Sequence, residues 1–376
     1  MADDNLLSKV HGLSDLELAA LLCLMNREHC LVSTPPEALD ELIDELQLIV
    51  AKTFGLRPAV VHCTPQTTLD DFAIAILGAA SPAAPRAPSP FAVRNNNLTA
   101  DSYFTSRPGA LTPLTSITTT SPTGAAPSMA NVIIAKNLNL APKAVQIQAL
   151  ELLRTRRIFT RTSVQAAPKQ FLLVAALAAR SGGEARVTPH LNDFLYLAHW
   201  HDPEDGFANL EEEYELPVSG GDAETASTES VVVRKSLSGE PVVSLDPLLS
   251  DASIATLGEL GRHVQIDVDV VRYQMNIISY MRIHRAVGGG ISPTATQHFD
   301  QLVKSLAPLH GIDYVTPALV ALALKKVYLH RIQMASASQE RSMQWGSRAE
   351  VVEAYLGDFA PEDVMDEVLD MVSTPL

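Results

Sequence analysis

Apolar positions along the chain alternate between short continuous runs and longer stretches of helical spacing. The run at 132–135 is apolar throughout, which is typical of a strand buried on both faces of a parallel sheet. A polar turn follows it, and apolar residues then recur at helical spacing from Val145 to Leu153. Similar short runs lie at 30–32, 59–63 and 171–178. This order predicts an α/β domain built on a parallel sheet.

Capping boxes mark two of the expected helix starts. In such a box a Ser or Thr side chain accepts an early backbone N–H, and an acid three residues later reaches back to the cap. Ser14 with Glu17 predicts a helix to about residue 26, and Thr68 with Asp71 predicts one to about 77. Between them, a further helix has an apolar face made by Leu39, Leu42, Ile43, Leu46 and Val50.

The second half of the chain has a different pattern, which is helical from 245 to 334. Two segments elsewhere have no sustained periodicity. Residues 79–130 are crowded with Pro, Ser, Thr and Ala, and 217–241 are rich in Gly, Ser, Glu and Thr. Such compositions bury too little apolar surface to offset the entropy of ordering. We therefore expect a disordered insertion and a flexible linker.

These patterns divide the chain into four parts. The α/β domain is expected over 1–216 and contains the disordered insertion at 79–130. The linker, or second insertion, covers 217–241. A helical domain follows at 242–335, and a helical tail at 336–376 ends in an amphipathic helix on Val364, Val368 and Met371.

Composition narrows the classes of function. A formal net charge of −15 over 376 residues argues against nucleic-acid binding, which needs clustered Lys and Arg. No apolar run reaches the ~18 residues of a membrane span, and the acidic start is unlike a signal peptide, so we expect the cytosol or the nucleus and no membrane partner. The three cysteines have no metal or redox spacing and are expected to be buried free thiols.

Several segments carry a family resemblance. Asn139, Ala141, Pro142, Gln146, Leu150 and Glu151 stand at the spacing found after the Walker B strand of AAA+ ATPases of the magnesium-chelatase I-subunit and MoxR branch. The segments 290–295, 311–317 and 327–331 resemble lid motifs of the same branch. The resemblance implies a parallel-sheet AAA+ domain, which is P-loop NTPase-like, followed by an α-helical lid domain.

The residues that handle nucleotide in that family are substituted in this sequence. The substituted positions run from the phosphate loop through Walker B and sensor 1 to the arginine finger and sensor 2: Thr34, Pro35, Pro36, Lys136, Asn137, Ala178, Asp193 and Thr294. Phosphoryl transfer depends on positioning and on neutralising charge, and loss of one arginine finger alone typically costs ~10³ in rate. We therefore predict no catalytic residues.

Three functional hypotheses follow. The first is a non-hydrolysing scaffold or regulatory subunit without cofactor, which binds protein partners such as an active AAA+ paralogue or further copies of itself. The second is the one that the resemblance implies directly: an ATPase subunit of a magnesium-chelatase-type complex, which drives Mg²⁺ insertion into protoporphyrin IX, or a related remodelling ATPase, with ATP and Mg²⁺ as cofactors. The third is an unrelated α/β protein, which a different strand order would favour.

Two other clusters have candidate chemistry. On a strand, His199 and His201 project from one face and could bind a metal with Asp202 or Glu204, but a strand end that runs into an acidic turn is the stronger explanation of the segment. The glycines at 288–290 could cradle an anion, but they more plainly end a helix near 287. His330 and Arg331 are expected at a helix C-terminus, where positive charge suits the dipole.

Overall fold

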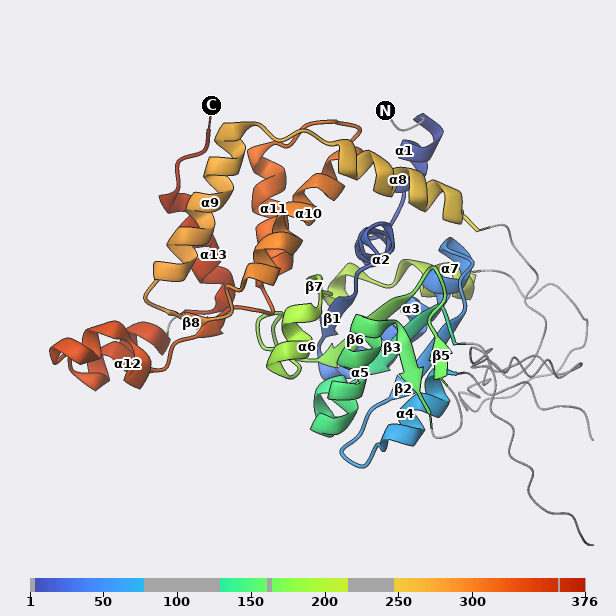
Figure 1. Cartoon of the computed structure of the whole chain (residues 1–376), viewed down its shortest axis with the longest axis horizontal. Helices are drawn as coiled ribbons and strands as arrows, with labels where there is room; N and C mark the ends of the chain where they lie inside the picture. Colours follow the sequence, from blue (N-terminus) through green and yellow to red (C-terminus); the bar gives the residue numbers. More distant parts are fainter. Residues whose placement is uncertain (1–3, 78–128, 161–163, 216–246, 358, 376) are drawn as a thin grey trace, which may run out of the picture.

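The computed structural model describes residues 4–77, 129–160, 164–215, 247–357 and 359–375 (Figure 1). The predicted insertion and linker lie outside the described residues, apart from Met129 and Ala130, which are both buried. No helix among the described residues combines the length and apolarity needed to cross a membrane.

The centre of the first half is a sheet of five strands in the order β2-β3-β6-β1-β7, and every neighbouring pair is parallel. The strands are β1 (Cys30–Thr34), β2 (Pro58–His62), β3 (Val132–Lys136), β6 (Leu172–Ala178) and β7 (Leu197–Trp200). The three inner strands are buried along nearly their whole length, so the prediction from continuous apolar runs is confirmed. Strand β1 lies between β6 and β7, although both come much later in the chain.

A helix follows each of the first four sheet strands, as parallel connections require. They are α3 (Leu39–Leu48), α4 (Leu69–Ile76), α5 (Lys143–Thr155) and α6 (Pro189–Phe194). The capping box at Thr68 and Asp71 is formed as predicted. A small antiparallel pair, β4 (Arg157–Phe159) and β5 (Val164–Ala166), stands apart from the main sheet, and α7 (Ala208–Glu215) follows β7.

Helix α2 (Asp15–Asn26) joins the sheet to the second half of the molecule. Its capping box at Ser14 and Glu17 is formed, and its residues are buried almost all round, so it has little amphipathic character. It contacts β1, β6 and β7 on one side and two later helices, α8 (Asp251–His263) and α10 (Pro293–Leu309), on the other. The preceding helix, α1 (Asp4–His11), was not predicted.

The second half is helical (Figure 1). Besides α8 and α10 it contains α9 (Val268–Ile283), α11 (Pro317–Tyr328), α12 (Ala349–Gly357) and α13 (Pro361–Met371). The prediction that 288–290 ends a helix is wrong, because α9 already ends at Ile283. Val287–Gly289 instead forms a short strand, β8, which pairs with β9 (Gln333–Met334).

Cys23, Cys30 and Cys63 are free and buried, as expected.

Candidate functional site

Six of the eight predicted positions meet at the carboxyl ends of β3, β6 and β1, which are neighbours in the sheet. Thr34 ends β1 opposite Ala178, and Lys136 ends β3 opposite Ala176. In open α/β sheets ligands bind at this edge, where the order of strands reverses. The structure thus brings the predicted site together in space, and the contacts of each residue decide what it can hold.

The connection from β1 to α3 is too short to wrap a phosphate. One residue, Pro35, separates Thr34 from a 3-10 turn, η1 (Pro36–Ala38), which leads directly into α3. Two of these residues are prolines without a backbone N–H, whereas an anion cradle needs several such donors. The carbonyl of Thr34 accepts a hydrogen bond from Ala179 N at 3.0 Å, so the chain stays attached to the sheet.

Lys136 forms an ion pair with Asp40, which lies in the first turn of α3. The Lys136 side chain is 18% exposed and that of Asp40 is 74% exposed, so the pair is partly in solvent and contributes little to stability. Its importance is its position. A cation stands at the carboxyl end of β3, and an acid stands at the N-terminus of α3.

Asn137 is bonded to the neighbouring strand. Its backbone is left-handed, with φ 54° and ψ 44°, a conformation that Asn tolerates better than most residues. Its N–H donates to Ala176 O at 2.8 Å, and its side-chain oxygen accepts from Ala178 N at 3.3 Å. The side chain therefore fastens β3 to β6 and has an internal partner.

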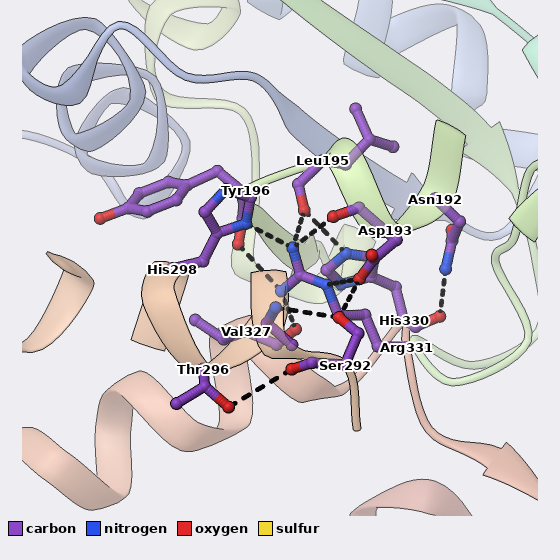
Figure 2. Close-up of polar contacts among 11 residues, drawn as sticks. Asn192, Asp193, Leu195, Tyr196, Ser292, Thr296, His298, Val327, His330 and Arg331 are labelled. Carbon is purple, nitrogen blue, oxygen red and sulfur yellow. Dashed lines mark hydrogen bonds and ion pairs between the residues drawn. The ribbon is translucent and has the colours of Figure 1, made fainter. Parts of the chain in front are cut away.

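Asp193 lies on α6 and contacts the helical half of the molecule. Its carboxylate accepts a hydrogen bond from Ser292 Oγ at 2.5 Å and lies 3.6 Å from Arg331 Nε (Figure 2). Ser292 also caps α10, and Thr294 lies half-buried in the first turn of the same helix. Asp193 is thus placed at the contact between the two halves, and Thr294 lies on the helix that Ser292 caps, apart from the strand ends that carry the other six positions.

Arg331 is the centre of that contact. It follows α11, is 2% exposed, and donates to main-chain carbonyls of the segment that joins α6 to β7. Its Nη2 lies 2.5 Å from Leu195 O and 3.2 Å from Asp193 O, and its Nη1 lies 2.7 Å from Val327 O and 3.4 Å from Tyr196 O (Figure 2). One buried guanidinium therefore holds the helical half against the sheet half.

The surroundings of Arg331 keep it charged and its neighbours neutral. Burial lowers the pKa of Arg331 to about 10, an effect that the nearby Asp193 opposes, so it stays protonated at neutral pH. Burial, together with the charge of the adjacent Arg331, also lowers the pKa of His298 to about 3. His298 is therefore neutral, and its Nδ1 accepts from Arg331 Nη2 at 2.6 Å.

Other polar contacts reinforce this docking. Asn192 Nδ2 donates to His330 O at 2.7 Å, and burial lowers the pKa of His330 well below its usual range. Further along the same face of α10, Asn26 accepts from Gln301 Nε2 at 3.1 Å and from Ser305 Oγ at 3.0 Å. The expectation that 330 and 331 end a helix is wrong, because α11 ends at Tyr328 and the two residues belong to the interface.

The role of Arg331 in docking the two halves was not predicted from the sequence, although the sequence contains a signal for it. Arg331 stands in an otherwise largely apolar stretch, 327–332, where a solvent-facing arginine would be unusual.

Two of the three candidates for a metal, His199, His201 and Asp202, have a partner within the protein at one ligand atom each. The two histidine rings do lie close, with centroids 6.3 Å apart. However, Lys326 Nζ donates to His199 Nδ1 at 2.8 Å, and burial, aided by Lys326, lowers the pKa of His199 to about 3. Asp202 accepts from Glu204 N at 3.1 Å as a local cap. Among the described residues, no group of three or more His, Cys, Asp or Glu is placed to hold a metal.

Comparison with known proteins gives the fold a family context. Residues 279–353 match the AAA lid domain. A crystal structure of a candidate ATPase from Cytophaga hutchinsonii superposes with a TM-score of 0.60 at 12% identity, covering 99% of this chain and 98% of its own. The chain has an AAA+ fold. Its parallel-sheet part is followed by a helical part that contains the AAA lid.

Two further similarities are weaker. The chain is 28% identical over 93 residues to maintenance of telomere capping protein 2 of Kluyveromyces lactis, a match that covers 23% of this chain and 34% of that protein. The chain thus matches about a third of the length of this relative. A full-length MCM homologue from Methanopyrus kandleri covers 87% of this chain and 58% of its own at 11% identity, and its TM-score of 0.41 supports no conclusion.

Proposed function

We propose that this chain is an AAA+ module that acts by binding other proteins and does not hydrolyse ATP. The observation that carries the proposal is the ion pair between Lys136 and Asp40. Together they place positive charge where Mg²⁺ would sit and negative charge where the triphosphate would sit. Both signs are opposite to what phosphoryl transfer requires.

Two neighbouring features support the same proposal. Helix α3 begins within a few residues of Thr34 after two prolines, so few free N–H groups face the place of a β-phosphate. Asp193, at the position of the family's arginine finger, is engaged by Ser292 and Arg331 of the lid side. An arginine finger must instead reach a neighbouring subunit's nucleotide.

The partner we propose is a protein, either an active AAA+ paralogue or further copies of this chain, in the cytosol or the nucleus. ATP and Mg²⁺ are not part of the proposed function. We also propose that the chain is divided into four parts: an α/β domain at 1–216, a linker at 217–241, a helical lid domain at 242–335 and a helical tail at 336–376. The name of the Kluyveromyces lactis relative refers to telomere capping, so proteins of that process belong among the partners to be tested.

Nucleotide binding is the direct test. The free energy of unfolding of the purified chain, measured by thermal denaturation, is expected to change by less than a few tenths of a kcal/mol between zero and millimolar ATP. This holds with or without Mg²⁺. Ligand at a concentration equal to its dissociation constant would already stabilise by about 0.4 kcal/mol. A calorimetric titration of ATP into the protein should show no saturable heat.

Hydrolysis needs a control for contaminating ATPases. We expect no turnover above a buffer blank from the wild type, Lys136→Ala or Lys304→Ala. Lys304 is a matched control because it pairs with Asp300 on α10, away from the strand ends. Turnover that persists in Lys304→Ala and disappears in Lys136→Ala would overturn the proposal and favour an ATPase subunit of the magnesium-chelatase type.

A further inference from the structure

A cavity of about 280 Å³ opens beside the β8–β9 pair, on the lid side of the molecule. Its lining residues include Arg282, Arg341 and the three glycines at 288–290. Arg282 lies in the last turn of α9, and Arg341 begins a 3-10 turn, η6 (Arg341–Trp345). Two segments far apart in the sequence thus bring two arginines to one small hollow.

These two arginines differ from their neighbours in having no acid partner. Within the described ranges, neither Arg282 nor Arg341 forms an ion pair. Arg262, Arg272 and Arg285, all on the lid side, each pair with an acid. Uncompensated positive charge is notable in a chain whose net charge is −15.

The acids nearest to the cavity are already engaged. Glu340, next to Arg341 in sequence, is 4% exposed and accepts from Arg285 Nε at 3.0 Å and from Ser342 N at 2.8 Å. At the other end, Ser292 lines the cavity and donates to Asp193, which is also paired with Arg331. Neither carboxylate is therefore free to neutralise the two guanidinium groups.

A structural role explains part of this arrangement, but not all of it. Arg341 Nη2 donates to Arg282 O at 3.3 Å and so satisfies a carbonyl at the end of α9. A guanidinium has five N–H donors, and this bond uses one. Gly290 is required by the backbone, because φ is +95° and a Cβ there would lie 1.8 Å from Arg331 O. Neither fact accounts for the second arginine or for the unpaired charge.

We propose that this cavity binds a phosphate monoester carried by a phosphoserine or phosphothreonine side chain of a partner protein. Guanidinium groups match the oxygens of a phosphate with paired hydrogen bonds, and Arg clusters are a common means of recognising phosphorylated segments. Both arginines are exposed, so a phosphate on a short side chain reaches them from the surface. The lining has no aromatic ring on which a nucleobase could stack, which favours a peptide over a nucleotide.

The test uses the full chain and a fluorescently labelled Ala/Gly heptapeptide with one central phosphoserine. Fluorescence anisotropy should show saturable binding with a dissociation constant at or below about 1 mM. Arg282→Gln and Arg341→Gln should each weaken binding about tenfold or more, because each removes a charged donor to phosphate. Arg341→Gln keeps an N–H donor for the Arg282 carbonyl, and circular dichroism checks the fold of both variants.

The matched control is Arg272→Gln, which changes another exposed arginine of α9 that pairs with Asp269 and does not line the cavity. It should leave binding within about twofold of the wild type, as expected for a screened surface charge. The proposal is overturned if the unphosphorylated peptide binds equally well, or if all three variants bind alike. If inorganic phosphate binds as tightly as the peptide, the proposal that the bound phosphate group belongs to a peptide side chain is overturned.

Discussion

Arg331 shows how one residue can have a role unlike the one that its sequence neighbourhood indicates. The resemblance places it in a lid motif, and the helical pattern places it at a helix end. In the structure it lies beyond α11, and its guanidinium satisfies carbonyls of both halves of the molecule. A buried charge is tolerated only when such partners satisfy it, so the residue and its carbonyls depend on each other.

Replacing Arg331 by Met should therefore destabilise the protein strongly. The change leaves the carbonyls of Leu195 and Tyr196 and the Asp193 carboxylate with fewer partners, and breaking such buried networks costs about 3–5 kcal/mol. Urea unfolding followed by circular dichroism measures the difference. Arg272→Met, at an exposed and paired arginine, should change stability by less than about 1 kcal/mol. Equal effects of the two changes would contradict the docking role.

The sequence predicts which positions make up the candidate site, but it does not predict which residues contact one another there. The sequence identifies Lys136 as a misplaced cation, because β3 is a local apolar run. It does not identify Asp40 as its partner, since the two are 96 residues apart and meet only when β1 and β3 take their places on either side of β6. The same limit hides Arg331, whose acceptors lie about 135 residues upstream.

At the scale of elements, local signals predicted four of the five strands of the sheet, but they missed α1 and failed at the ends of α9 and α11. Continuous apolar runs and capping boxes depend on neighbours a few residues apart, and β3, β6, α2 and α4 were found where these patterns placed them. Strand β8 depends on β9, more than 40 residues later, whereas the local pattern of its glycines predicts a helix end. Pairing partners far along the chain leave no local periodicity.

Gly290, which follows β8, should be sensitive to the smallest substitution. Gly290→Ala adds both the strain of a positive φ and a clash with the Arg331 carbonyl, and we expect a loss of about 2–4 kcal/mol. Gly346→Ala separates the two effects, because φ is +84° there and no atom lies within 4 Å of the added Cβ. The free energy of unfolding of that control variant should fall by only about 1–2 kcal/mol. Thermal unfolding of both variants provides the comparison.

For the whole molecule, buried histidines make stability depend on pH, and His29, His199 and His298 are three of them. Burial lowers the pKa of His29, His199 and His298 to about 3, while each takes up a proton near 6.5 in the unfolded chain. Their stabilising contribution is therefore full above pH 6.5 and is lost as the pH falls, at about 1.4 kcal/mol per pH unit for each.

One carboxyl opposes this trend. Burial raises the pKa of Glu28 from 4.5 to about 7, so its contribution is full below 4.5 and is lost as the pH rises to 7. Glu28→Gln should make the fall in stability below pH 6.5 steeper, and it should stabilise the protein above pH 7 by about 2 kcal/mol. Urea midpoints of both proteins between pH 5.5 and 8 measure this. A wild-type urea midpoint that stays constant between pH 5.5 and 7 would contradict this pH dependence of stability.

The burial of α2 between the sheet and the lid has a mechanical consequence. In a two-part molecule with a hinge, a pull on one part is absorbed by rotation at the joint. Here the joint contains a nearly fully buried helix and a guanidinium tied to carbonyls of both parts, so opening it would expose apolar surface and unpaired charge together. A load applied at the lid is therefore expected to reach the sheet without rotation at this joint.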